Sequence, residues 1–174
     1  ATKDGIDAMG NVGIVSVFAA GNDNQNVDSF PSGGNPSPGY PARYTSPSII
    51  AVASSTSTDA RSSFSNYGLT SIDIAAPGSG ILSTYVNSGN TGTATLSGTS
   101  MATPHTTGAV ALLAAYRPDL SVASLKASLL NNVDVLAGWS TFVRTSGRLN
   151  VFRAMQTPTV CSFPTDLTVP TKGG

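Results

Sequence analysis

The chain has 174 residues, which fits one ordinary domain. Only 10% of them are charged, against about 25% in an average soluble domain, and nine acidic and nine basic side chains cancel to a net charge of zero. Because no basic surplus exists to neutralise phosphates, the composition argues against a nucleic-acid partner. One Cys and one His exclude an internal disulfide and a closed zinc site. No apolar run is long enough to span a bilayer, so we expect no membrane partner.

The polar residues are mostly uncharged, with 24 Ser, 20 Thr and 11 Asn, and all nine acidic residues are Asp. With 18 Gly and 11 Pro, this composition predicts a loop-rich globular protein, and it weakly favours a secreted one. Residues 1–10 lack the basic start and apolar stretch of a signal peptide, and they resemble the middle of a helix. Either the protein stays inside the cell or this is a mature piece whose leader is gone; we expect the second, an extracellular fragment.

In chain order, the first half predicts one helix and several strands. A helix is expected at 4–9, and short apolar runs predict buried strands at 13–20, 48–53 and 71–76. Shorter strand candidates lie at 81–85 and 93–96. The polar stretch 21–39 is a long loop, and loops of that length are usually functional or disordered.

The second half predicts helices. Residues 102–116 are apolar on nearly every side, which is typical of a buried helix. Further helices are expected after the cap at 118–121 and at 149–155. The order favours an α/β domain with a mostly parallel sheet over residues 1–155, followed by a tail or linker at 156–174.

The segment 97–105 places a serine at the head of the buried helix. Pro104 lacks the N–H that would bond the carbonyl of Ser100, which fits a helix that begins within one turn of Pro104. Ser100 then lies at a helix N-terminus, where free N–H groups and the helix dipole stabilise negative charge. Acyl transfer needs a hydroxyl nucleophile beside such donors. The alternative is that Ser100 is only a helix cap.

Residues 98–105, Gly-Thr-Ser-Met-Ala-Thr-Pro-His, resemble the nucleophile motif of the subtilisin-like serine proteases, the subtilase or peptidase S8 family. Further segments that are similar to signatures of that family lie at 19–22, 39–42, 64–68, 73–78 and 147–150. In total, the resemblance covers about residues 4–155. The resemblance implies the C-terminal part of a three-layer catalytic domain and a serine endopeptidase that acts on proteins or peptides.

The resemblance also implies roles for single residues. Ser100 would be the nucleophile, and the side-chain amide of Asn22 would bind the oxyanion together with the Ser100 backbone N–H. The alternative for Asn22 is a plain turn residue. The implied substrate-binding residues are Ala19, Ala20, Gly21, Gly39 and Thr99. The first three would line one wall of the specificity pocket and Gly39 its base, leaving room for a large apolar side chain.

The sequence departs from the family pattern at two points. Residues 106–108 read Thr-Thr-Gly, where Gly108 is expected to allow close helix packing and the two Thr hydroxyls to bond the preceding turn. More seriously, the Asp and His that precede the nucleophile in the family are absent. His105 is rotated about 140° from Ser100 along a helix, so we expect a structural role for it. The N-terminal part of the domain is therefore an expected partner, and this chain alone should be inactive.

Two alternatives remain open. A catalytically inactive relative that serves as a binding module would keep the motif without the chemistry, and a nucleotide-binding domain is disfavoured because its glycine-rich motifs are absent. No cofactor is required and no metal site is predicted, but the resemblance implies that calcium can bind as a structural ion. Oxygen ligands for calcium would come from Asp23, Asn24, Asn26 and Asp28, although an ordinary polar loop is preferred. Asp73 is expected to support the core.

Overall fold

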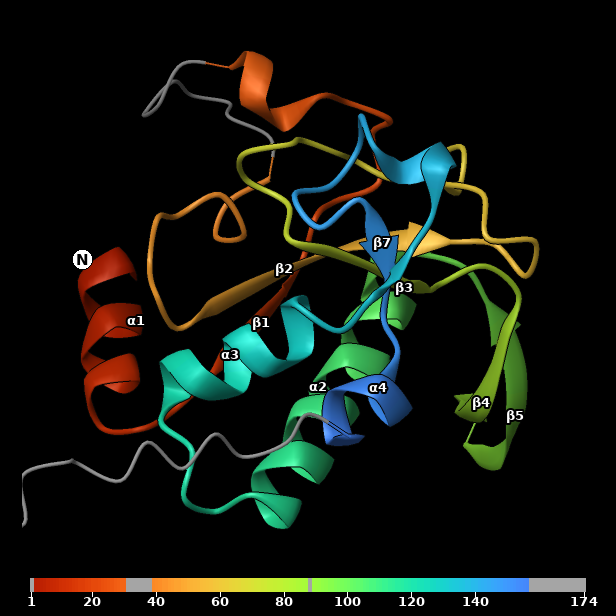
Figure 1. Ribbon diagram of the computed structural model, residues 1–174. Coiled ribbons are helices and arrows are strands. Elements are labelled where there is room, and N and C mark those ends of the chain that lie inside the picture. Colours follow the sequence, from red (N-terminus) through yellow and green to blue (C-terminus); the bar gives the residue numbers. More distant parts are fainter. Residues whose placement is uncertain (1, 31–38, 88, 157–174) are drawn as a thin grey trace, which may run out of the picture.

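The computed structural model describes residues 2–30, 39–87 and 89–156. Its centre is a sheet in the order β1-β2-β3-β7-β6 (Figure 1). Strands β1, β2, β3 and β7 pair in parallel, and β6 pairs antiparallel with β7 at one edge. The bounds of the strands are β1 (Ser16–Ala19), β2 (Ile49–Ser55), β3 (Ile74–Pro77), β6 (Asp134–Val135) and β7 (Gly147–Arg148). The predicted α/β class with a mostly parallel sheet is confirmed. The expected tail at 156–174 lies, apart from Gln156, outside the described residues.

The helices overlap the predicted ones. Their bounds are Thr2–Asn11 (α1), Thr99–Tyr116 (α2), Val122–Leu130 (α3) and Val151–Gln156 (α4), with short 3₁₀ turns at Val27–Ser29 and Ala137–Trp139. Helices α2, α3 and α4 contact one another, and α2 packs on β1, β2 and β3 (Figure 1). In the described part of the chain, no helix has the length and apolar character needed to cross a membrane.

The sheet separates two hydrophobic clusters. All seven residues of β2 are buried, and alternate ones point to opposite faces. Ile50 and Val52 pack toward α2, α3 and α4, whereas Ala51 and Ala53 pack toward loops on the other face. The loop-side cluster contains Trp139, which is fully buried. Its Nε1 donates a hydrogen bond of 2.7 Å to the carbonyl of Asp59.

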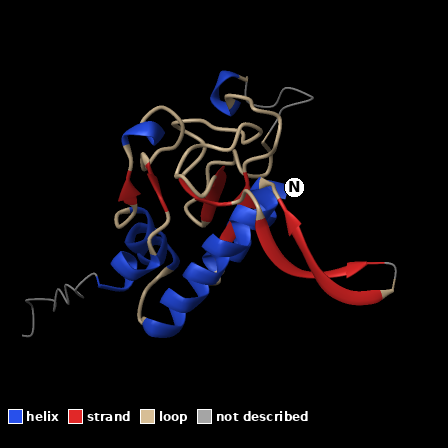
Figure 2. Cartoon of the chain, turned by 90° about the vertical axis from the view of Figure 1, so that its right-hand side faces the viewer, coloured by secondary structure: helices blue, strands red, loops and turns tan. Residues whose placement is uncertain are grey.

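Helix α2 is buried on one side only. The sequence predicts apolar contacts nearly all round, but the opposite side is exposed, with Leu112 at 49% and Tyr116 at 57%. The sequence predicts that Gly108 allows close helix packing, but a Cβ added there would meet nothing within 4 Å, so no neighbouring element of the described chain packs closely against it. Figure 2 shows α2 crossing the near side of the molecule. The difference arises because the described chain supplies covering elements, the sheet with α3 and α4, on one side alone.

Strands β4 (Ile81–Asn87) and β5 (Asn90–Leu96) form an antiparallel hairpin that is separate from the main sheet. Figure 2 shows the hairpin extending away from the body. Its apolar side chains Leu82 and Val86 are about two-thirds exposed, at 67% and 70%. Both strands were expected from the sequence, and they are longer than predicted.

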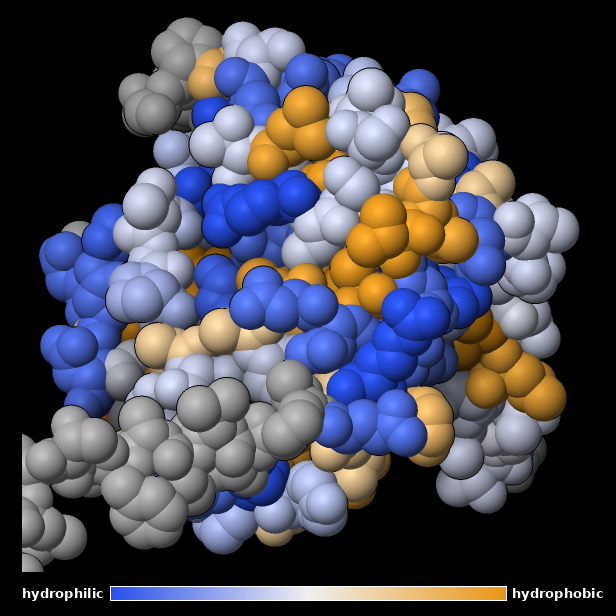
Figure 3. Space-filling view, viewed as in Figure 1, coloured by the Kyte–Doolittle hydropathy of each residue, from blue (hydrophilic) through white to orange (hydrophobic). Residues whose placement is uncertain are grey.

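Two carboxylates, those of Asp73 and Asp134, form ion pairs and hydrogen bonds next to the sheet. Asp73 is buried, accepts a hydrogen bond of 3.0 Å from Ala51 N, and pairs with Arg144 at 2.9 Å, which supports the expected structural role. Asp134 accepts bonds from Arg148 at 2.7 Å and from Asn150 at 2.9 Å. Strongly hydrophilic side chains gather beside α4 in Figure 3. The second group ties β6 and β7 to the start of α4.

Candidate active site

The predicted site forms where β1 ends and α2 begins. The chain leaves β1 at Ala19 and reaches Asn22 within three residues, at the carboxyl edge of the parallel sheet. Gly98 reaches the same edge because its N–H donates to the carbonyl of Gly78, just after β3, at 2.8 Å. A Cβ on Gly78 would stand 2.7 Å from the Gly98 carbonyl, so the two loops pack backbone to backbone.

Asn22 is joined to the head of α2 by Thr99. The Asn22 Oδ1 accepts one hydrogen bond from Thr99 N at 2.9 Å and another from Thr99 Oγ1 at 3.0 Å. The same hydroxyl oxygen accepts a bond from Gly21 N at 3.2 Å. Because an amide oxygen has two lone pairs, both are used here, and only the Nδ2 group of Asn22 is left to donate.

That Nδ2 group and the backbone N of Ser100 border one small space. Each lies 3.7 Å from the point where a Cβ would stand on Gly98. Among the described residues, no acceptor is bonded to the Ser100 N–H. The structure thus brings together the two groups that sequence reasoning paired as donors, and a residue without a side chain leaves the space between them open.

Ser100 lies in the first turn of α2, and its side chain is exposed. The residue at the cap position is Gly98, without a side-chain hydrogen bond, so Ser100 does not cap the helix. The Ser100 hydroxyl is therefore not used as a helix cap, and it lies at the positive end of the dipole of an 18-residue helix.

His105 bonds the helix backbone. Its Nδ1 lies 2.9 Å from the carbonyl oxygen of Met101, one turn earlier. Among the hydrogen bonds of the described residues, none joins His105 to Ser100. The described chain therefore presents no imidazole hydrogen-bonded to the serine hydroxyl.

Sequence reasoning did not single out Asn66, which holds the loop around Asn22. Asn66 is fully buried, and its side chain bonds the backbone of Ala20, Asp23 and Gln25. Its segment, 64–68, was noticed only as a family signature. A polar residue of this kind between apolar stretches also occurs in ordinary turns, so the sequence carried no separate signal.

The other predicted substrate-binding residues lie around the same loop. Ala20 is fully buried in the loop-side cluster together with Val27. Gly39 also contacts Val27, since a Cβ there would stand 3.0 Å from Val27 Cγ1. Ala19 ends β1 half-buried. Residues 31–38 lie outside the described chain, and the substrate-binding roles of Ala19, Ala20, Gly21, Gly39 and Thr99 stay predictions.

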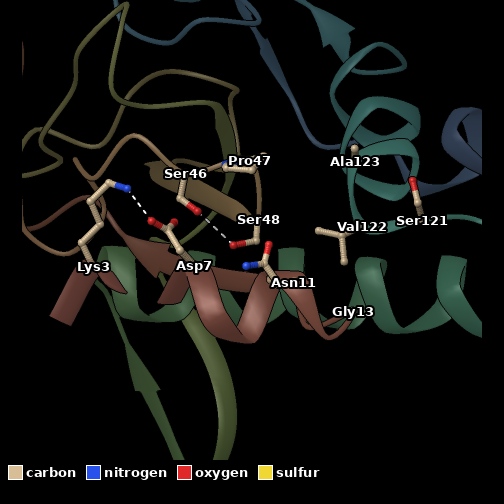
Figure 4. Close-up of a pocket in the computed structure, with 11 residues that line it drawn as sticks. Lys3, Asp7, Asn11, Gly13, Ser46, Pro47, Ser48, Ser121, Val122 and Ala123 are labelled. Atoms are coloured by element: carbon tan, nitrogen blue, oxygen red, sulfur yellow. Dashed lines mark hydrogen bonds and ion pairs between the residues drawn. The ribbon is translucent and has the colours of Figure 1, made fainter. Parts of the chain in front are cut away.

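Two of the cavities beside the helices bear on the site. One of about 600 Å³ lies between α1, residues 46–48 and the start of α3 (Figure 4), and none of the predicted site residues lines it. Another of about 320 Å³ is lined by residues of β4 and by Met101, Pro104 and His105 of α2. The second cavity therefore opens next to the residue that follows Ser100.

The candidate calcium ligands serve separate partners. Asp28 accepts bonds from Thr70 N and Ser71 N at 2.7 and 3.1 Å. The Oδ1 of Asn24 accepts from Arg61, and the Oδ1 of Asn26 accepts from Asp28 N. Among the described residues, no group of three or more His, Cys, Asp or Glu is placed to hold a metal. Calcium binding by these oxygens stays an untested prediction.

Comparison with known proteins decides the family. The sequence model of the subtilase family matches residues 2–157, which include every residue that the structure describes. This chain belongs to the subtilase family. Thermitase from Thermoactinomyces vulgaris is 44% identical over 146 residues, which are 84% of this chain and 46% of thermitase. An extracellular serine proteinase from a Thermus species is 44% identical over 69% of this chain and 26% of its own length.

The fold comparison agrees with the family. A solved protease chain from Pseudoalteromonas arctica superposes with a TM-score of 0.73 at 29% identity, covering 88% of this subtilase chain and 45% of its own. The chain thus spans about half the length, or less, of these relatives. The subtilase assignment made from the motif at 98–105 is confirmed.

Proposed function

We propose that this chain is the nucleophile-bearing part of a serine endopeptidase of the subtilisin type. The observation that carries the proposal is the space at Gly98, bordered at 3.7 Å both by Asn22 Nδ2 and by Ser100 N. Two N–H donors around one space beside a serine hydroxyl suit the oxygen of a tetrahedral intermediate. An endopeptidase of this kind needs no cofactor in that step.

In the proposed reaction, Ser100 Oγ attacks the carbonyl carbon of the scissile peptide bond while a base takes its proton. The carbonyl oxygen gains the negative charge and accepts hydrogen bonds from Asn22 Nδ2 and Ser100 N. The C–N bond then breaks, the amine leaves with the proton from the base, and an ester on Ser100 remains. Water hydrolyses this ester and restores the hydroxyl.

The base must come from outside this chain in our proposal, since His105 is bonded to Met101. We propose that the remaining, N-terminal part of the catalytic domain supplies it and covers the exposed side of α2. Three observations support this arrangement: the uncovered Leu112 and Tyr116, the cavity beside Met101, and the apolar edge strand β1, which pairs with β2 alone in the described part of the chain. This chain alone would then be inactive.

We also propose an extracellular location and protein or peptide substrates, by similarity to the Thermus relative named an extracellular serine proteinase. Calcium, if it binds, would have a structural role only.

Labelling with a fluorophosphonate tests the proposal, because the probe reacts only with an activated serine hydroxyl. In the full-length protein we expect one labelled site, Ser100, identified by mass spectrometry of the labelled peptide. Ser100→Ala should remove the label, whereas Ser97→Ala, a change at a nearby exposed serine, should keep it.

An unlabelled full-length protein that is correctly folded would instead favour the inactive relative acting as a binding module. Labelling of the 174-residue chain alone would contradict the external base.

A further inference from the structure

The loop that carries Asn22 is held by a side chain from a distant part of the sequence, Asn66. This side chain is fully buried. Its Oδ1 accepts hydrogen bonds from Asp23 N at 3.0 Å and from Gln25 N at 2.9 Å. Its Nδ2 donates to the carbonyl of Ala20 at 3.0 Å and lies 3.5 Å from Asp23 Oδ2. The amide thus uses all of its donors and acceptors on one short loop.

The backbone of the same residue adds a further link. Asn66 N donates to the carbonyl of Gly21 at 2.9 Å. Gly21 has a φ of +100°, and a Cβ there would stand 2.4 Å from Asn66 Nδ2. The close approach of the two residues therefore depends on glycine at position 21.

Asn22 is consequently fixed from two directions. Its backbone neighbours, Gly21 and Asp23, are both bonded to Asn66, while its side-chain oxygen is bonded to Thr99. If the bonds from Asn66 to Gly21 and Asp23 are lost, the backbone on both sides of Asn22 can move, and the Cα of Asn22 moves with it. Its Nδ2 could then move relative to Ser100 N without any change in Asn22 itself.

We propose that Asn66 is a positioning residue for the oxyanion donor Asn22, an inference that rests on the proposed function. Asn66 touches no reacting atom, and it acts by holding residues 20–25 so that Nδ2 faces the space at Gly98. Because the donor is needed most when charge develops on the oxygen, its displacement should lower kcat more than it raises KM.

A double-mutant cycle in the full-length enzyme tests this proposal. Asn66→Ala should lower kcat by about 10-fold or more, because small misplacements of catalytic groups are that costly. KM should change by less than about 2-fold, as expected when ground-state binding is kept. In an Asn22→Ala background, the donor is already gone, so adding Asn66→Ala should lower kcat by less than about 2-fold. Equal losses in both backgrounds would overturn the positioning role.

A second variant covers a failure of Asn66→Ala to fold. Asn66→Ser keeps an uncharged polar group at this buried position but is too short to make all of the bonds to the loop, so a smaller kcat loss is expected, again absent in the Asn22→Ala background. As a matched control, Asn150→Ala removes a half-buried Asn that bonds Asp134 and Arg153 N. It should lower stability and leave kcat unchanged.

The outcomes separate this inference from the proposed function. If Asn22→Ala alone leaves kcat unchanged, the oxyanion role of Asn22 fails, and the positioning role fails with it. If Asn22→Ala lowers kcat but Asn66→Ala and Asn66→Ser do not, only the positioning role fails. The size of the Asn22→Ala loss has a reference, about 100-fold or more, measured for such a donor in subtilisin, which belongs to the same family.

Discussion

At the residue scale, the site depends on an atom that is missing, the Cβ of Gly98. The φ of this residue is 163°, an extended conformation that any residue adopts. A Cβ would meet Met101 Sδ at 3.6 Å and the two donor nitrogens at 3.7 Å, which are ordinary contact distances. Glycine at 98 is therefore not required for folding, but it keeps the space between the donors open.

Gly98→Ala should separate folding from activity. We expect the free energy of unfolding to stay within about 1 kcal/mol of the wild type, because no clash or strained backbone results. We expect kcat to fall at least about 10-fold, because the added methyl group occupies the place of the oxyanion. Denaturant unfolding and steady-state kinetics on a peptide substrate measure the two effects. Gly5→Ala, at an open helical position in α1, is the matched control, and a wild-type kcat for Gly98→Ala would refute the shared space as an oxyanion site.

At the scale of elements, β6, β7 and α4 are held together by Asp134. Bonds from Asn150 and Arg148 hold the pKa of the Asp134 carboxyl below its usual value, and Arg153 adds to the effect. A carboxyl with a lowered pKa in the folded state stabilises the fold above its unfolded pKa of about 3.9. That contribution disappears as the pH falls through the lower, folded pKa.

Asp134→Asn should therefore flatten the acid limb of the stability profile. At neutral pH we expect a loss of about 0.5–1 kcal/mol, because the ion pairs are partly exposed and screened. Below the folded-state pKa of Asp134 the variant and the wild type should converge. Urea unfolding between pH 2.5 and 7 measures the curves, and high salt should reduce the difference at neutral pH. Parallel curves at every pH would mean that the carboxylate charge contributes nothing.

Some elements were predictable because their signal is local. The run of apolar residues at 48–53 predicted β2, and Pro104 placed the head of α2 near Ser100. Strands β6 and β7 have two residues each, which is too short for any periodicity, so the sequence did not reveal them. Asn66 acts through contacts with residues more than 40 positions away in the chain, and Gly98 acts by leaving a space open. Both lie in the family-like segments 64–68 and 98–105, but the sequence pattern did not indicate these roles. The exposed side of α2 was also unpredictable, since composition does not reveal which neighbours a helix has.

At the scale of the molecule, apolar surface gathers where covering elements are lacking. Among the exposed apolar side chains are Leu112 and Tyr116 on α2 and Leu82 and Val86 on the hairpin. The chain has few charged residues whose repulsion would prevent such apolar surfaces of two molecules from associating. In our proposal, the rest of the catalytic domain covers the α2 side. A charged substitution at Leu112 should then lower the stability of the full-length protein more than the same substitution at an exposed position.

Leu112→Asp tests this coverage in the full-length protein. If the position is buried there, the charge should lower the free energy of unfolding by about 2 kcal/mol or more. If it is exposed, as in this chain, the change should be within about 0.5 kcal/mol. Phe152→Asp, at an exposed position of α4 that is 69% accessible and outside the proposed contact, is the control and should stay within the smaller range.

The single tryptophan gives this subtilase chain an internal optical probe. Trp139 has no solvent exposure, its Nε1 donates to the carbonyl of Asp59 in the turn after β2, and the ring of Phe142 lies edge-on at 6.2 Å. Its emission should be short in wavelength when the loop-side cluster is packed, and should shift to the red when that cluster opens to water. Because the one tryptophan of this chain lies on the face opposite α2, binding at the α2 side should leave its emission unchanged. Fluorescence therefore separates loss of the core from loss of the partner.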